Sequence, residues 1–176
     1  MDLDKIDQYN RRSNLILRNI VVPDEDETQE DLKIIIDKVF KEEMQLSDEV
    51  VNDIDKYHRT GYSKRNKNGK KTQNIIIRFK THKSRYACLE KKKNAKTGKL
   101  SPNLTKKRGK ILYDAGNIIK DKEINSIDLV FANRHGDLQV RLATPYEGKQ
   151  VFPFYSLQVL DDFLLERRLI DESKFC

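Results

Sequence analysis

Lysine and arginine side chains are the groups with the clearest chemical potential in this sequence, and they gather between Lys56 and Lys110. That segment contains 20 Lys or Arg and a single acid, Glu90, so its formal charge is +19. The whole chain carries +7, which leaves −12 for all other residues. Ammonium and guanidinium groups at this density bind polyanions, of which nucleic acid is the commonest. Because the two signs are segregated, we favour this interpretation over a charged surface that only confers solubility.

An acidic segment precedes the basic one. Residues 23–55 hold 13 acids against three lysines, a net charge of −10. If the two segments occupy opposite faces of one domain, the resulting dipole orients the molecule on a polyanion before contact. The acidic face also suits a basic partner or self-association. A structural or interaction protein is therefore the alternative function.

Catalytic chemistry has little support in the sequence. His58, His82 and His135 are isolated, without the HxxxH or HExxH spacing of zinc sites. There is no Gly-rich phosphate cradle and no GxSxG elbow. Solvation at a helix start and on a helix face explains the paired acids of 24–27 and 161–162. We expect no enzyme, catalytic residue, metal site, cofactor or small-molecule substrate; a metal-dependent nuclease is the enzyme class that a basic cleft leaves open.

The two cysteines, Cys88 and Cys176, lie far apart and form no CxxC pair. This pattern favours two reduced thiols in a cytosolic or nuclear protein. No apolar run approaches the roughly 18 residues of a membrane span, and the N-terminus has no signal-peptide core. We therefore predict a cytoplasmic or nuclear location, or both, and no membrane partner.

The apolar pattern places most of the cations on a folded domain of residues 13–100, after a polar lead-in of 1–12. Thr28 is a helix N-cap with Asp31 in the capping-box position, and Ile75, Ile77 and Phe79 share the inward face of one strand. Strands are expected at 13–22, 50–59, 74–79 and 99–100, helices at 28–44 and 83–93, and a mobile loop at 62–72. This order predicts an α+β fold with the ferredoxin-like βαββαβ architecture of RNA-recognition-motif domains.

Residues 101–176 are expected to form a second, small α/β domain after the break at Pro102. Thr105 caps a helix whose inward residues extend to Ile119, and Ser156 caps the last helix. Strands at 127–132 and 138–143 form a hairpin in which Gly136 can take a positive φ. A third strand is expected at 148–154, and the end from 171 to 176 is expected to fray.

Several short motifs resemble the first-open-reading-frame protein of LINE-type retrotransposons. They are N-L-I-L-x-x-I from Asn14, H-R-x-G from His58, N-I-I-I-R-F from Asn74, the lysine-rich tract 91–98 and N-L-T-K-x-R from Asn103. The last third, from residue 111 to 160, also resembles the C-terminal domain of the baculovirus few-polyhedra protein. The resemblance spans residues 13–165, and it is carried by the order in which the motifs follow one another.

The resemblance implies an RNA-recognition-motif-like domain and a C-terminal domain that together grip single-stranded nucleic acid, with RNA preferred. It also implies a mobile element or virus as the source, a nucleic-acid chaperone activity and self-association. The resemblance to the few-polyhedra protein keeps a viral or transposon-encoded assembly or interaction factor open as the alternative function. The family's arginine-rich grip carries over to Arg59, Arg78 and Arg108. With the exposed tracts, the predicted contacts lining a basic cleft between the domains are Arg59, Lys64, Arg65, Lys70, Lys71, Arg78, Lys91, Lys92, Lys93, Lys106, Lys107, Arg108, Arg134 and Arg141.

The expected third strand departs from ordinary RNA-recognition domains. The usual stacking motif on this strand is K/R-G-F/Y-G/A-F-V-x-F/Y. Here the strand instead places Ile76 and Arg78 on the sheet face that points away from the core. Tyr57, Tyr62 and Tyr86 are the aromatics available for stacking, and the last is better placed in the core. We therefore expect binding to depend on phosphates, with little sequence preference.

Overall fold

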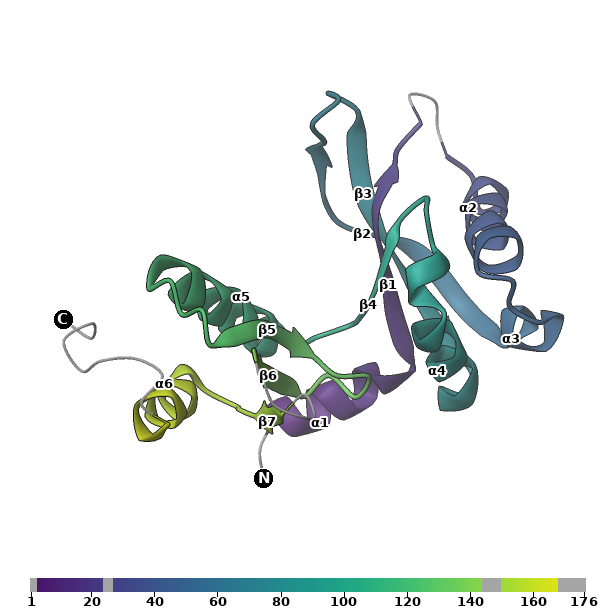
Figure 1. The fold of residues 1–176 in the computed structure, drawn as a ribbon. Helices are drawn as coiled ribbons and strands as arrows, with labels where there is room; N and C mark the ends of the chain where they lie inside the picture. Colours follow the sequence, from purple (N-terminus) through teal and green to yellow (C-terminus); the bar gives the residue numbers. More distant parts are fainter. Residues whose placement is uncertain (1–2, 24–26, 144–149, 168–176) are drawn as a thin grey trace. The chain divides into compact units, whose positions relative to one another are not determined.

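The computed structural model describes residues 3–23, 27–143 and 150–167, which fold into two compact units. Residues 9–103 form one unit, and the described residues of 1–8 and 104–176 form the other (Figure 1). Both contain an antiparallel sheet and helices, which confirms the predicted α+β class. The division falls three residues beyond the expected one at 100. The expected polar lead-in is largely helix α1 (Leu3–Asn10), whose residues up to Gln8 belong to the second unit.

The unit of residues 9–103 is built on a four-stranded sheet with strand order β2-β3-β1-β4, all neighbours antiparallel. Its helices α2, α3 and α4 lie along one side of that sheet (Figure 1). In chain order the elements are the 3-10 turn η1 (Arg11–Ser13), β1 (Asn14–Val21), α2 (Gln29–Asp37), the π-helix η2 (Lys38–Glu43), α3 (Asp48–Asn52), β2 (Ile54–Arg65), β3 (Lys71–Phe79), α4 (His82–Glu90), the 3-10 turn η3 (Lys92–Asn94) and β4 (Lys99–Pro102).

Strand alternation builds the core of this unit. Leu15 and Leu17 in β1 and Ile75, Ile77 and Phe79 in β3 are buried on the helix-covered face. This confirms the predicted inward face of β3, since residues two apart in a strand share a face. The core is completed from the helices by Leu32, Ile36, Phe40, Val51, Cys88 and Leu89.

The predicted capping box starts α2. The Thr28 hydroxyl accepts the Asp31 N–H at 3.2 Å, and the Asp31 carboxylate accepts the Thr28 N–H at 2.9 Å. Each bond satisfies a backbone or side-chain group that the first helical turn leaves open. The helix then widens into η2, where the N–H of Met44 bonds to the carbonyl of Val39 at 2.9 Å.

Three predicted boundaries in this unit are wrong. The strand expected at 50–59 starts only at Ile54, because Val51 enters the core from the short helix α3. The loop expected at 62–72 is mostly hairpin: β2 and β3 extend to Arg65 and Lys71, and the turn is held by Asn66, whose side chain accepts the N–H groups of residues 68 and 70. The helix expected at 83–93 ends at Glu90 and is followed by η3.

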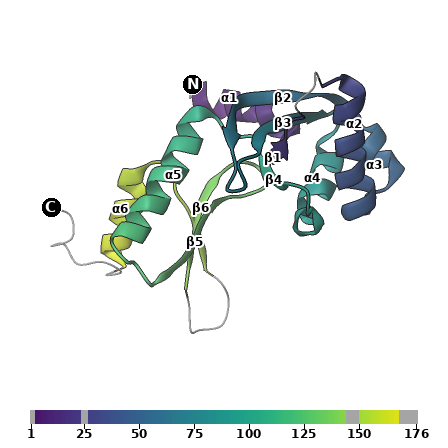
Figure 2. The same ribbon diagram turned by 90° about the horizontal axis from the view of Figure 1, so that it is seen from above.

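The second unit contains α5 (Lys106–Asp121), β5 (Ile127–Ala132), β6 (Leu138–Leu142), β7 (Val151–Pro153) and α6 (Leu157–Glu166) (Figure 2). Its sheet order is β5-β6-β7, antiparallel, and its core includes Ala115, Val140, Leu160 and Leu164. The predicted caps at Thr105 and Ser156 are confirmed, since each hydroxyl accepts a backbone N–H three residues on at 3.2 Å.

Some expected features lie outside the described residues. They are most of the acidic cluster 24–27, the first two residues of the strand expected at 148–154, and the end from 171 to 176 with Cys176. Within the described part, β7 covers residues 151–153 of that expected strand.

Gly98 is a position where the fold requires the absence of a side chain. A Cβ there would lie 2.6 Å from Ile20 Cδ1 and 2.9 Å from the Arg18 carbonyl oxygen. We predict that Gly98→Ala lowers the free energy of unfolding by about 1–3 kcal/mol, because backbone must move to relieve the overlap. Gly109→Ala is the control, since a Cβ there meets nothing within 4 Å in α5. It should be neutral or stabilise by up to about 1 kcal/mol. Equal denaturation midpoints for the two variants in urea unfolding would contradict this packing.

Candidate nucleic-acid interface

The face of the four-stranded sheet opposite its helices carries the candidate site. Ile76 in β3 lies opposite Ile16 in β1 and His58 in β2, while Arg78 lies opposite Lys56. Strand pairing adds Lys99 and Ser101 of β4 to the same face, opposite Arg18 and Ile16. We call this surface the open face, and its residues are Asn14, Ile16, Arg18, Lys56, His58, Thr60, Asn74, Ile76, Arg78, Lys99 and Ser101.

The open face combines an apolar centre with cations. Ile16 and Ile76 are half-buried neighbours in the middle of the sheet, and a hollow of about 210 Å³ beside Ile76 is also lined by Asn14, Lys56, His58 and Arg78. An apolar floor with cationic walls accommodates a planar apolar group joined to an anionic one. A nucleotide has this combination.

Arg78 projects from the non-core face, as predicted. Its side chain is 63% exposed, and its Nε lies 3.4 Å from Asp55 Oδ2. An exposed ion pair at that distance contributes little free energy. The guanidinium is therefore available to fork onto phosphate oxygens.

Three further cations of the open face, Arg18, Lys56 and Lys99, were not among the predicted contacts. Arg18 Nε donates to Ser101 Oγ at 2.7 Å, and partial burial lowers the pKa of its guanidinium. An arginine has so high a pKa that it remains charged. The signal for Arg18 was present in the sequence, because it alternates with Leu15 and Leu17, but only the register places Lys99 beside it.

The β2–β3 hairpin brings together four predicted contacts. Lys64, Arg65, Lys70 and Lys71 are all exposed near its tip. Arg65 pairs directly with Lys71 across the hairpin, and Arg65 Nη1 donates to the carbonyl of Gly69 at 2.9 Å. Like charges directly opposite each other destabilise a sheet. An anion bound at the tip would remove this repulsion.

Arg59 is a structural residue, and the prediction that its guanidinium is open to a ligand is wrong. It points to the helix-covered face, with its side chain 13% exposed. All five of its N–H donors are used: two by the Glu27 carboxylate, and the others by the carbonyls of Ile20, Val21 and Gln73. The residue therefore ties the start of α2 to the end of β1 and leaves no donor for phosphate.

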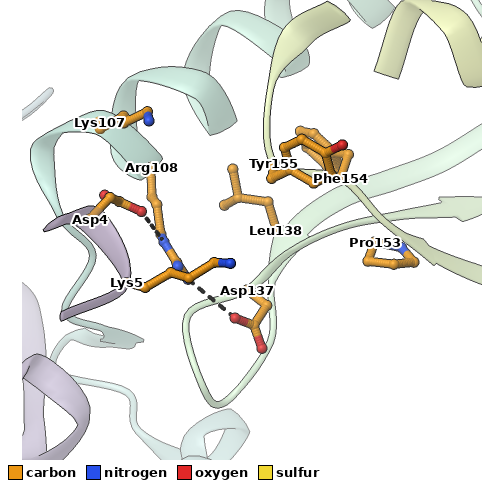
Figure 3. Close-up of a pocket in the computed structure, with 9 residues that line it drawn as sticks. All are labelled: Asp4, Lys5, Lys107, Arg108, Asp137, Leu138, Pro153, Phe154 and Tyr155. Carbon is orange, nitrogen blue, oxygen red and sulfur yellow. Dashed lines mark hydrogen bonds and ion pairs between the residues drawn. The ribbon is translucent and has the colours of Figure 1, made fainter. Parts of the chain in front are cut away.

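Arg108 donates from Nε and Nη1 to groups of its own unit, a scaffold role that the sequence did not predict. Its Nε donates to Asp4 at 2.8 Å and its Nη1 to Asp137 at 3.2 Å (Figure 3). Nη1 also donates to the Gly136 carbonyl at 2.9 Å. Burial alone would raise the pKa of Asp4, but hydrogen bonds from Arg108 and Thr105 hold it below its usual range. Arg108 thus links α1, α5 and the β5–β6 turn.

A cavity of about 390 Å³ lies beside this arginine (Figure 3). Its apolar lining includes Leu138 and Phe154, which are buried, and Tyr155, which is 77% exposed. The side chains of Lys5 and Lys107 line it as well, and neither makes a hydrogen bond or ion pair with another residue in the described ranges. Of the predicted contacts at the start of α5, the exposed Lys106 and Lys107 therefore remain available, whereas Arg108 uses Nε and Nη1 within its unit.

The remaining predicted contacts differ in availability. Lys92 and Lys93 are exposed in η3, whereas Lys91 Nζ donates to the carbonyl of Gln45 at 2.8 Å. Arg134 is exposed in the β5–β6 turn. Arg141 Nε donates to Asp128 Oδ2 at 2.6 Å, so this cation is already paired.

The loop after η3 is anchored by Glu43, which sequence reasoning did not single out. Its carboxylate accepts the N–H groups of Lys96 and Thr97 and the Thr97 hydroxyl. Burial alone would raise the pKa of Glu43, but these hydrogen bonds hold it below its usual range. The anchor fixes the backbone of the lysine-rich tract to η2.

Two buried groups of α4 belong to the scaffold. Arg85 is fully buried, its Nε donates to the Asn14 carbonyl at 3.1 Å, and burial lowers the pKa of its guanidinium. Burial raises the pKa of the Cys88 thiol to about 12, so it stays protonated at neutral pH. The sequence did not predict that Arg85 is buried or that it bonds to Asn14, because the two residues lie far apart in the chain.

A search of the structure for metal sites and membrane-spanning helices, and a comparison of the chain with known proteins, add no further site. Within residues 3–23, 27–143 and 150–167, no three or more His, Cys, Asp or Glu side chains cluster in a way that could hold a metal ion. No helix in those ranges has the length and apolar character needed to cross a membrane. No protein-family model matches the chain, and no curated protein matches it.

The fixed position of Arg59 gives a testable distinction between scaffold and interface. We predict that Arg59→Ala lowers the free energy of unfolding by about 3–5 kcal/mol, because it leaves the Glu27 carboxylate buried without its partner. Arg59→Lys should recover only part of the loss, since one ammonium cannot replace five donors. Chemical unfolding of both variants measures this. Wild-type stability in Arg59→Ala, with nucleic-acid binding lost, would restore Arg59 to the interface.

Proposed function

We propose that this chain binds single-stranded nucleic acid, RNA preferred, without catalysing a reaction on it. The open face and the tip of the β2–β3 hairpin form the interface. The observation that carries the proposal is the arrangement of Arg18, Lys56, Arg78 and Lys99 around the apolar pair Ile16 and Ile76. In the described part of this unit, α2, α3 and α4 all pack on the other face of the sheet.

We assign the unit of residues 9–103 to the ferredoxin-like βαββαβ architecture. The strand order β2-β3-β1-β4 supports this assignment, as does the placement of α2 before β2 and of α4 between β3 and β4. RNA-recognition domains of this architecture bind unpaired bases on the sheet surface. The motifs that resemble retrotransposon and few-polyhedra proteins support a mobile element or virus as the source.

The proposed binding mode follows from the residue types. Arg78 forks onto phosphate oxygens, lysines such as Lys56 and Lys99 act as point charges, and Ile16 and Ile76 contact base faces. A duplex hides its base faces in the stack, so the apolar centre favours a single strand. Because the central strands carry aliphatic residues where stacking aromatics usually lie, the interface discriminates little between bases.

The charge distribution within the unit supports binding on the open face. Acidic residues gather in α2, η2 and α3, on the helix-covered side, for example Glu30, Glu42 and Glu49. Arg18, Lys56, Arg78 and Lys99 lie on the opposite face of the sheet. The resulting dipole turns the open face toward a polyanion during the encounter.

Phosphate contacts predict a steep dependence of affinity on salt. If six to eight phosphates are neutralised, a plot of log K against log[salt] should have a slope of about −4 to −6 on a single strand. Fluorescence anisotropy of a labelled oligonucleotide across a salt series measures this slope. A flat plot would contradict an interface built on phosphates.

Arg78→Ala tests the open face itself. We predict that affinity for a single strand falls roughly 5- to 30-fold, because one charge-assisted contact is lost. Stability should change by less than about 0.5 kcal/mol, since the side chain is exposed. The control is Lys33→Ala on α2, which removes the same charge from the other face. Equal affinities of the two variants for the oligonucleotide would mean that the nucleic acid binds elsewhere on the chain.

A further inference from the structure

The β2–β3 hairpin contains a bulge at residues 61–63. Thr60 pairs with Asn74, whereas the next pair along the hairpin joins Lys64 to Thr72. Three residues of β2 therefore stand against the single residue Gln73 of β3. Bulges of this kind bend a strand and re-aim a side chain, and they are over-represented beside functional sites.

Side-chain hydrogen bonds hold the bulge at both ends. Gln73 Nε2 donates to the carbonyl of Gly61 at 2.6 Å, and the Thr72 hydroxyl donates to the carbonyl of Lys64 at 3.0 Å. Gly61 has a φ of +77°, a conformation that favours glycine. The strand on the N-terminal side is fixed by the five donors of Arg59. The bulge is thus a defined conformation with both flanks secured.

The residue displayed by this bulge is Tyr62. Its side chain is 94% exposed, and it makes no hydrogen bond, ring contact or cation–π contact with any residue that the structure describes. The two other tyrosines considered for stacking are engaged in the fold. Tyr57 packs against the core and donates its hydroxyl to the Gln29 carbonyl at 3.4 Å, and Tyr86 also packs against the core. Packing within the described residues therefore does not account for an aromatic ring at position 62.

The chemistry around Tyr62 identifies the ligand. Lys64, Arg65 and Lys71 are exposed on the same hairpin, and the sequence has no acid from Lys56 to Leu89. A protein partner would need a larger apolar patch than one ring within a field of cations. A flat ring between point charges matches an unpaired base between its phosphates.

We propose that Tyr62 stacks on one unpaired base of the bound strand, while Lys64 and Arg65 hold the neighbouring phosphates. This inference rests on the proposed function and adds a base contact to an interface otherwise made of phosphates and aliphatic side chains. Every base has a π-face, so the contact raises affinity without selecting a sequence.

The absence of tryptophan from the sequence allows a direct test. In Tyr62→Trp, all tryptophan emission comes from the bulge. We expect it to be quenched by an oligouridylate and unchanged by an abasic strand of the same length, whose phosphates remain. Tyr113→Trp is the matched control, because Tyr113 is 69% exposed on α5. It should show no difference between the two strands.

Affinities of the alanine and phenylalanine variants complete the test. Tyr62→Ala should bind oligouridylate about 5- to 150-fold more weakly, and Tyr62→Phe should keep most of the affinity, because the ring is retained. Binding of the abasic strand, followed by dye anisotropy, should be the same in the wild-type chain and in both variants.

The outcomes separate this inference from the proposed function. If the wild-type chain binds neither strand, the proposed function fails and the inference fails with it. If both strands bind but the emission of Tyr62→Trp responds equally to them, only the stacking contact is overturned. An equal loss of affinity for both strands in Tyr62→Ala would also overturn it. The ring would then support the conformation of the hairpin and would not stack on a base.

Discussion

The register of β3 between β1 and β2 is the constraint on which the rest of this unit depends. Side chains alternate along a strand, so the same segment delivers Ile75, Ile77 and Phe79 to the core and Ile76 and Arg78 to the open face. A shift by one residue would expose Ile75, Ile77 and Phe79 and turn Arg78 toward the core. The core therefore enforces the position of the cations, and the proposed interface needs no separate device to hold Arg78 outward.

Charge alone does not distinguish a scaffold arginine from a binding one. Arg59 and Arg78 lie in neighbouring strands, yet the first donates five hydrogen bonds inside the fold and the second is mostly exposed. Arg85 and Arg108 also donate inside the fold, the first to the Asn14 carbonyl and the second to Asp4, Asp137 and the Gly136 carbonyl. Arg59 joins β2 to β1 and β3, and Arg85 holds the start of β1. Exposed cations such as Arg78 therefore lie on strands that these contacts fix.

Local chemistry made part of this structure predictable. The caps at Thr28, Thr105 and Ser156 satisfy backbone groups a few residues away. The alternation of core and exposed side chains in β3 can be read from residues 74–79 alone. The roles of Arg59 and Arg108 were not predictable, because their partners Glu27 and Asp4 are 32 and 104 residues away. The start of β2, the length of the hairpin and the bulge that displays Tyr62 likewise depend on strand pairing, which a single sequence does not reveal.

Backbone amide chemical-shift changes, mapped as an unlabelled single-stranded RNA is added to the isotope-labelled chain, test the open face most directly. If the open face is the interface, the largest changes fall in β1, β3, β4 and the β2–β3 hairpin, and the exposed residues of α2 and α3 are unaffected. Changes concentrated on the acidic helices, or none at saturating RNA, would contradict the claim that the open face is the interface.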